Sequence, residues 1–184
     1  MALTNYNTVQ KFKENFNGGT RANRFEVIST SGWPGGVNLD KSETKFKIIS
    51  ATLPEATLGT IVVGYRGRNL HLGGDRSYKT WNISLYDDNN TNNLWRAFQK
   101  WKELLDSHTT HKVYNKDFAY KNLKKTWIIN QLNINGDTSI RSIVLHSCWP
   151  ISVGALNMSM KEVNLATFSV SLQFDYFEIK KGLL

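Results

Sequence analysis

The chain has 184 residues, of which 40% are hydrophobic and 12% aromatic, so it can bury an ordinary core and is not disordered as a whole. The single cysteine, Cys148, excludes an intramolecular disulfide, and without a signal pattern or a run of about 18 apolar residues we expect folding in a reducing cytoplasm. The formal net charge of +8 leaves nucleic acid open as a partner.

The first half of the chain is expected to be an arm followed by strands. Residues 1–23 are rich in asparagine and contain the Gly18-Gly19 pair, which indicates an N-terminal arm with one helical turn around Val9 to Phe16. Residues 24–184 are interpreted as a single domain. Its first strands, separated by turns that include Gly73-Gly74, are expected at Arg24–Ser29, Thr44–Leu53, Thr60–Leu72 and Ser77–Tyr86.

A helix is predicted over residues 93–105. Apolar side chains recur there at helical spacing, and the Asn/Thr run that ends at Asn93 supplies an N-cap. This helix is expected to pack on the sheets, because its apolar stripe needs a partner. The bulky side chains predicted to share that core are Trp81, Phe98, Trp101, Trp149 and Phe174.

The second half is again β-rich. Strands are expected at Trp127–Asn133 and Thr138–Ser147, joined by the turn sequence Asn135-Gly136-Asp137. The closing strand, Thr167 to Glu178, alternates apolar and polar residues, so one of its faces should be buried. The predicted architecture is therefore mainly β, a β-sandwich or partly closed barrel with one packed helix.

No pattern in the chain supports catalysis, a metal or a cofactor. His108 and His111 have metal-ligand spacing but too few neighbouring donors, so a solvated loop is expected. His146 and Cys148 would share a strand face, where packing is expected rather than an activated thiolate.

Two other patterns that suggest chemistry have simpler interpretations. Asp87 and Asp88 are expected to begin the turn into the helix rather than act as an acid/base pair, because consecutive strand residues point to opposite faces. The glycines between residues 64 and 74 match neither a P-loop nor a dinucleotide fingerprint. A small-molecule substrate is not expected.

A basic segment at about 107–126 is read as an insertion after the helix. Its lysines are interleaved with aromatic residues, which suits stacking on single-stranded nucleic acid, a solvated loop, or contact with an acidic protein surface. The lysines are Lys112, Lys116, Lys121, Lys124 and Lys125.

Several short motifs in one order give the chain a family resemblance. They are Phe25-Glu26-Val27, Ala51-Thr52-Leu53-Pro54, Val63-Gly64-Tyr65 with Arg68, Gly74-Asp75-Arg76 with Trp81, the aromatic helix around Trp95 to Trp101, Trp149-Pro150 with Val153-Gly154, and the end Asp175-Tyr176-Phe177-Glu178. None is specific alone, but their order over most of the chain resembles the tail tube proteins of contractile-tailed bacteriophages.

The resemblance implies a structural role in a virion. Such proteins form hexameric rings whose strands combine into one barrel, and the rings stack into a tube inside the sheath, through which DNA passes without specific binding. Partners would be further copies of the chain, the tail sheath protein, and baseplate and tail terminator proteins, with assembly in the host cytoplasm. The interface residues implied are Tyr65, Arg66, Arg68, Asp75 and Arg76.

The sequence leaves several points open. Pairing of Asp75 and Arg76 within the turn or across a subunit boundary is equally consistent with the residues, and the resemblance favours the boundary. The lysine-rich segment would face the sheath, whereas the lumen should be neutral or acidic, using Thr80, Asn82, Ser84 or Ser169, Ser171, Gln173, Asp175. Alternatives are a baseplate tube initiator, the inner tube of a phage-derived contractile injection system and, from another class, a nucleic-acid-binding β-barrel.

Overall fold

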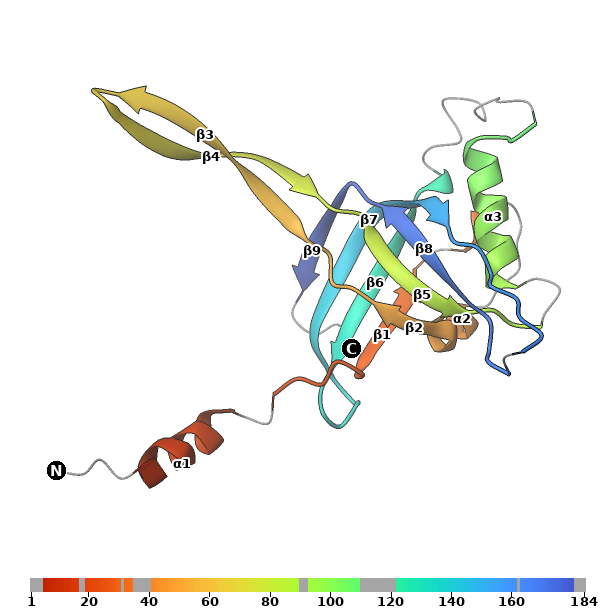
Figure 1. The fold of residues 1–184 in the computed structure, drawn as a ribbon, viewed down its shortest axis with the longest axis horizontal. Coiled ribbons are helices and arrows are strands. Elements are labelled where there is room, and N and C mark those ends of the chain that lie inside the picture. The colour runs from red at the N-terminus through yellow and green to blue at the C-terminus, as the bar shows by residue number, and fades with distance from the viewer. Residues whose placement is uncertain are drawn as a thin grey trace.

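The computed structural model describes residues 5–16, 19–30, 32–34, 41–89, 93–109, 122–161 and 163–180, which are mainly β (Figure 1). The helices are α1 (Asn5–Phe16), α2 (Lys41–Lys47) and α3 (Leu94–Leu105). The strands are β1 (Phe25–Ser29), β2 (Ile48–Ala51), β3 (Ala56–Tyr65), β4 (Arg68–Tyr78), β5 (Trp81–Tyr86), β6 (Lys125–Leu132), β7 (Ser139–Val153), β8 (Thr167–Gln173) and β9 (Tyr176–Lys180).

Strand β7 joins two halves of one antiparallel sheet. Within the described residues the strand order is β1-β6-β7-β8-β5-β2, and β9 also pairs with β7. The first part of β7 pairs with β6 and β9, and its last part, from Trp149, pairs with β8. Between them Ser147 has φ +58°, and the β6–β7 register shifts there. The sheet is therefore bent at this bulge but not closed, which confirms the predicted mainly β fold with one packed helix.

Helix α3 covers an aromatic core. Asn93 caps the helix by accepting a hydrogen bond from the Arg96 backbone N–H at 2.9 Å, as the sequence predicts. Phe98 and Trp101 are buried, and the Trp101 indole N–H donates to the Leu123 carbonyl at 2.8 Å. The rings of Phe98 and Trp127 stack with centroids 6.4 Å apart. Helix and sheet are thus joined by side chains that exclude water.

The five predicted core residues do not share one environment. Trp81, Phe98, Trp101 and Phe174 are fully buried, whereas Trp149 is only partly buried. Trp149 lies just beyond the β7 bulge, where its ring faces the Lys124 ammonium at 4.5 Å from the ring centroid. It packs at the margin of the core rather than within it.

Three strand predictions are wrong in their boundaries. Thr44–Leu53 is the end of α2 followed by β2: the alternation Lys45-Phe46-Lys47-Ile48 that suggests a strand falls on the last turn of α2, where Phe46 stays exposed. The predicted strand Thr60–Leu72 crosses a turn at Arg66-Gly67, where φ is +47° and +76°. The closing strand is two strands, because the chain leaves the sheet between Gln173 and Tyr176.

Gly73-Gly74 is therefore not a turn but part of β4. A Cβ added at Gly74 would lie 3.1 Å from the Gly59 backbone carbon, so the two chains approach closely there. The β3–β4 register also shifts between Leu58 and Thr60, which marks a bulge. The glycines allow this close approach, a role that the sequence pattern alone did not separate from a turn.

Two further elements are longer than predicted. Helix α1 begins at Asn5 and has three turns rather than one, and β7 continues to Val153 instead of ending at Ser147. The turn at Asn135-Gly136-Asp137 is present, with Gly136 at φ +82° and its N–H donating to the Asn133 carbonyl at 2.9 Å. Figure 1 shows α1 standing away from the sheet.

Replacing Trp101 by alanine should destabilise the monomer by about 3 to 5 kcal/mol, because it removes a buried ring and a hydrogen bond. Denaturant unfolding of the monomer followed by circular dichroism measures this. The control is Phe46→Ala on the exposed surface of α2, which should change stability by no more than about 0.5 kcal/mol. Equal effects at the two sites would contradict the packing of α3.

Candidate assembly surfaces

The β3–β4 hairpin projects from the body of the protein (Figure 1). Every residue of β3 is exposed, and so is nearly all of β4. The two strands pair only with each other among the described residues. An isolated two-stranded hairpin is marginally stable in water, so its length suggests that another surface supports it.

The two faces of this hairpin differ in chemistry. Cross-strand partners lie on the same face, which places Ile61 with Leu72, Val63 with Leu70, and Tyr65 with Arg68. We call the five apolar residues among them, Ile61, Val63, Tyr65, Leu70 and Leu72, the apolar hairpin face. The opposite face pairs Val62 with His71, Gly64 with Asn69 and Thr60 with Gly73, and is more polar. A face rich in Ile, Val and Leu on an otherwise solvated ribbon is typical of an interaction surface.

The five predicted interface residues all lie on this hairpin. Tyr65, Arg66 and Arg68 are at its tip, where the Arg66 guanidinium carbon lies 5.3 Å from the centroid of the Tyr65 ring. Asp75 and Arg76 lie in β4 beside the bulge and are exposed. Neither of them forms an ion pair with another described residue. Their charges are thus available to a second molecule.

Strands β5 and β8 together present a neutral polar face. Asn82 pairs with Ser171, and Ser84 pairs with Ser169. The Ser171 hydroxyl donates to the Asn82 side-chain oxygen at 2.7 Å, while Trp81, Ile83 and Leu85 point to the core side. Ser50 of β2 pairs with Ser84, and Ser152 of β7 pairs with Ser171, so both neighbouring strands widen this face. Most residues of the two sets that the sequence suggests for the lumen therefore lie on one uncharged surface.

Three of the proposed lumen residues lie at the margins of this neutral polar face. Thr80 is exposed in the link between β4 and β5, and Gln173 is partly buried at the end of β8. Asp175 lies in the link between β8 and β9, where both of its carboxylate oxygens accept from the Lys124 ammonium at 3.0 and 3.1 Å.

The basic segment is described only at its end. Lys112, Lys116 and Lys121 lie outside the described residues. Lys124 forms an ion pair with Asp175 and lies over the Trp149 ring. Lys125 is a partly buried residue of β6, and burial lowers the pKa of its ammonium. These last two lysines are thus engaged in the fold of their own chain.

No described group has the geometry of a catalytic or metal centre. Burial raises the pKa of the Cys148 thiol to about 12, so it stays protonated at neutral pH. The bulge at Ser147 interrupts the strand alternation, and the His146 ring stacks on Tyr176 with centroids 4.5 Å apart. No cluster of three or more His, Cys, Asp or Glu that could bind a metal ion occurs within the described residues.

The remaining candidates for chemistry also have structural roles. The His108 ring lies 3.5 Å from the Glu103 carboxylate, while His111 is outside the described residues. Asp88 pairs with Lys47 of α2, and the backbone N–H of Asp87 donates to the Ala166 carbonyl at 2.8 Å. These contacts fix the approach to α3, as expected for turn residues. No helix of the described chain has the length and hydropathy to span a bilayer.

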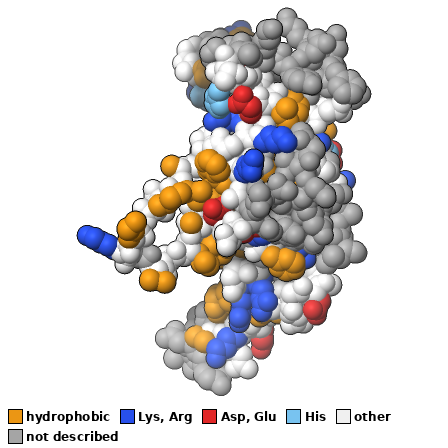
Figure 2. Space-filling view, turned by 90° about the vertical axis from the view of Figure 1, so that its right-hand side faces the viewer, with side chains coloured by type: hydrophobic (Ala, Val, Ile, Leu, Met, Phe, Trp, Pro, Cys, Tyr) orange, Lys and Arg blue, Asp and Glu red, His pale blue; other side chains and the backbone are white. Residues whose placement is uncertain are grey.

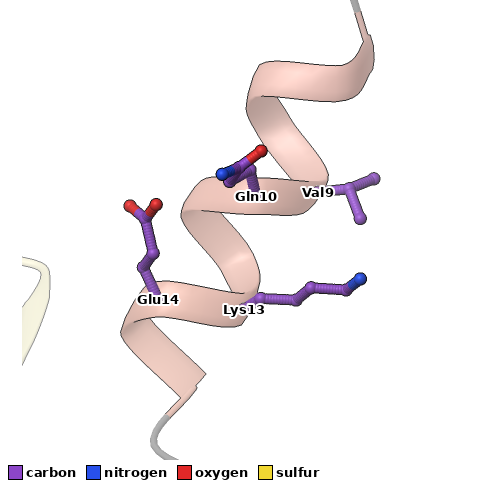
Figure 3. Close-up of a pocket in the computed structure, with 4 residues that line it drawn as sticks. All are labelled: Val9, Gln10, Lys13 and Glu14. Carbon is purple, nitrogen blue, oxygen red and sulfur yellow. The ribbon is translucent and has the colours of Figure 1, made fainter.

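A hollow lies beside α1. Its described lining is four side chains of this one helix (Figure 3). Val9 and Lys13 point to one side of the helix, and Gln10 and Glu14 point to the other. Phe12 and Phe16 stack with centroids 5.0 Å apart, both exposed. No second described element lines this hollow, so the described residues give no argument for a ligand site there.

Comparisons with known proteins agree on one family. A family model described as phage tail tube protein matches residues 8–180. Tail tube protein gp19 of Enterobacteria phage T4 is 26% identical over 134 residues, which cover 72% of this chain and 80% of that protein.

Solved structures share the fold. The tube-terminating cap of the anti-feeding prophage matches with a TM-score of 0.63 and 17% identity, over 89% of this chain and 91% of that chain. A chain of the sheath–tube complex of an extracellular contractile injection system, PVC, in its extended state matches with a TM-score of 0.60 and 15% identity, over 94% and 97%.

Cys148 should react with a thiol reagent such as DTNB only when the chain unfolds. The thiol is fully buried, and its raised pKa leaves almost no thiolate at pH 8. Spectrophotometric labelling should therefore show little reaction in buffer and one thiol per chain in denaturant. Rapid labelling of the folded protein at pH 8 would reopen the possibility of an activated cysteine.

Proposed function

The chain belongs to the phage tail tube protein family, and from this premise we propose that it forms hexameric rings that stack into the inner tube of a contractile tail. The observation that carries the proposal is the exposed β3–β4 hairpin with one apolar face. A surface of this kind, offered by every copy to a different surface on the next, makes a heterologous contact. Such contacts close rings or propagate along an axis.

The apolar hairpin face can supply enough free energy for assembly. Fully burying one Val, Leu or Ile side chain contributes about 1.5 to 3 kcal/mol. The five apolar side chains of this face each expose about half of their surface. Burying that exposed half against another copy contributes on the order of 5 kcal/mol per copy. Contacts repeated around a ring and between rings multiply this value, so a modest contact per subunit suffices for a tube.

Charge near the base of the hairpin would then set specificity. Asp75 and Arg76 have no ion-pair partner among the described residues, and both are exposed. In a polar rim, such groups select the correct partner and register more than they add affinity. We assign Asp75 and Arg76, with Tyr65, Arg66 and Arg68, to contacts between subunits or rings.

The neutral polar face of β5 and β8 suits the wall of a channel for DNA. Any lysine or arginine facing the lumen would recur in every subunit, so its phosphate contacts would accumulate along the genome. Serine and asparagine avoid that attraction while remaining hydrated. We therefore assign Asn82, Ser84, Ser169 and Ser171 to the lumen, through which DNA passes without specific binding.

The remaining partners follow from the role of a tube. The PVC relative occurs in a sheath–tube complex, and another occurs at a sheath/tube terminator. By analogy, this chain would contact a sheath through its outer surface, with Lys112, Lys116 and Lys121 of the lysine-rich segment as one contact. It would meet baseplate and terminator proteins at the tube ends. The role is structural rather than enzymatic, in a virion assembled in the host cytoplasm. The same surfaces would serve a tube initiator or a phage-derived injection device.

Negative-stain electron microscopy of the purified chain should show hexameric rings or tubes, and Asp75→Arg should abolish them. The residue is exposed on a hairpin outside the core, so the variant monomer should keep its wild-type melting temperature. The introduced arginine would carry the wrong charge for the intermolecular partner of Asp75. The control is Asp137→Arg in the exposed β6–β7 turn, which should leave assembly unchanged.

Each outcome of this experiment has a distinct meaning. A wild-type chain that stays monomeric at high concentration, with and without a nucleating baseplate, would contradict the proposed function. Normal tubes from Asp75→Arg would show that this carboxylate takes no part in assembly. Loss of the folded monomer would instead show that the hairpin supports its own chain.

A lysine placed on the neutral polar face should convert the tube into one that retains DNA. Ser171→Lys adds one ammonium per subunit to the proposed lumen, so tubes should hold a short oligonucleotide at low salt and release it at high salt. Nuclease protection locates the DNA. In tubes of the control Gln99→Lys, on α3, bound DNA should remain digestible. Protection in the control but not in Ser171→Lys would place α3 on the lumen side.

A further inference from the structure

The β7–β8 connection, residues 154–166, displays apolar side chains that the chain leaves uncovered. Met158, Met160, Val163 and Leu165 are 87%, 108%, 105% and 73% exposed. Single exposed apolar residues are ordinary, but a run of four on one short connection is not. Figure 2 looks at the side of the molecule that carries α3 and this connection, and hydrophobic side chains gather on the segment that projects at its left.

The connection is held at both ends, so its display of apolar residues is built into the fold. The Gly154 N–H donates to the Ser169 carbonyl at 2.7 Å, and the Trp95 indole N–H donates to the Gly154 carbonyl at 3.2 Å. At the other end, the Ala166 carbonyl accepts from the Asp87 N–H at 2.8 Å. Sheet and helix thus fix the two ends of the connection, while its middle faces water.

An acidic group lies beside this connection. The Asp88 carboxylate pairs with Lys47, whereas the Asp87 carboxylate has no ion-pair partner among the described residues. One Asp87 carboxylate oxygen is buried and accepts no hydrogen bond from the described chain. Within the sequence of the connection, the formal charges of Lys161 and Glu162 cancel. The Asp87 carboxylate, whose backbone N–H bonds the Ala166 end of the connection, is therefore not neutralised by a described cation.

The β3–β4 hairpin has the complementary properties. Its apolar hairpin face is flanked at the tip by the guanidinium groups of Arg66 and Arg68. The hairpin extends from one side of the molecule and the β7–β8 connection lies at the opposite side, so the two cannot meet within one chain (Figure 1). β4 has 11 residues, which at about 3.3 Å per residue reach roughly 35 Å.

We propose that the β7–β8 connection is the receptor for the apolar hairpin face of a second copy of this chain. The proposal rests on the proposed tube function and names the surface that receives the hairpin. Met158 and Met160 are flexible enough to mould around Leu70 and Leu72 of the incoming hairpin. Arg66 or Arg68 would then donate hydrogen bonds to the Asp87 carboxylate, a charge-assisted contact.

A second copy fits this surface better than another protein does. Both surfaces of the contact are present on every chain, at opposite sides of the molecule. Both are apolar, and the charges beside them are opposite in sign. A contact between two different patches of identical chains repeats without limit unless it closes, which is what a tube requires. An unrelated partner would cover the connection once per subunit but leave the apolar hairpin face exposed.

Disulfide crosslinking in assembled tubes tests the contact. Cysteine would replace Val63 on the apolar hairpin face together with Met158, Met160 or Leu165, one pair at a time, and tubes would be oxidised and run on non-reducing gels. At least one pair should convert monomer into a ladder of crosslinked chains. The matched control is Val62→Cys, the neighbouring residue on the opposite face, which should leave the chains monomeric. Native Cys148 is buried and should not react.

The outcomes separate this inference from the proposed function. Tubes that form but give no ladder with any of the three pairs, or equal ladders from Val62 and Val63, would overturn the receptor assignment and leave the tube function standing. A wild-type chain that forms no tubes contradicts the function itself.

A second measurement does not depend on crosslinking geometry. Met160→Asp changes a fully exposed side chain, so the monomer should keep its fold, while the protein concentration needed for tube formation should rise about tenfold or more. Met160→Leu is the control and should assemble like wild type. Equal assembly of Met160→Asp and wild type would likewise reject the receptor assignment.

Discussion

Strand β7 is the constraint on which the rest of the structure depends. It pairs with β6 and β9 along its first part and with β8 beyond the bulge at Ser147, so one strand holds both halves of the sheet. Helix α3 packs against it through the aromatic core. Once this bend is set, the β5–β8 face looks away from the core, and the β7–β8 connection leaves from the end of β7. A shift in the β7 register would move all of these surfaces together.

The chain places its apolar residues in two classes of environment. One class fills the core around Trp81, Phe98 and Trp127, where the side chains are buried within one chain. The other lies on the β3–β4 hairpin and the β7–β8 connection, where the chain cannot cover it. Hydrophobic burial stabilises the monomer in the first class and favours association in the second. An exposed ribbon that would be an aggregation hazard in a monomeric protein becomes useful when assembly is regular.

Two lysines of the segment that left nucleic acid open as a partner are engaged within the chain. Lys124 is bound to Asp175 and Lys125 is partly buried, so both serve the fold. The hydrated face of β5 and β8 carries serine and asparagine. In the tube that we propose, such a face would let DNA pass without holding it. Formal charge describes solubility and steering better than it describes a binding site.

By itself, the sequence determined the alternation of β5 and β8, the capped helix α3, four of the five core positions, and the motifs that resemble tail tube proteins, because each is a local pattern along the chain. Tertiary structure decided the rest. It placed the hairpin turn at Arg66-Gly67, divided the closing strand, and brought Asn82 beside Ser171, 89 residues away. Pairing across such distances depends on which strands become neighbours, and local periodicity carries no information about that choice.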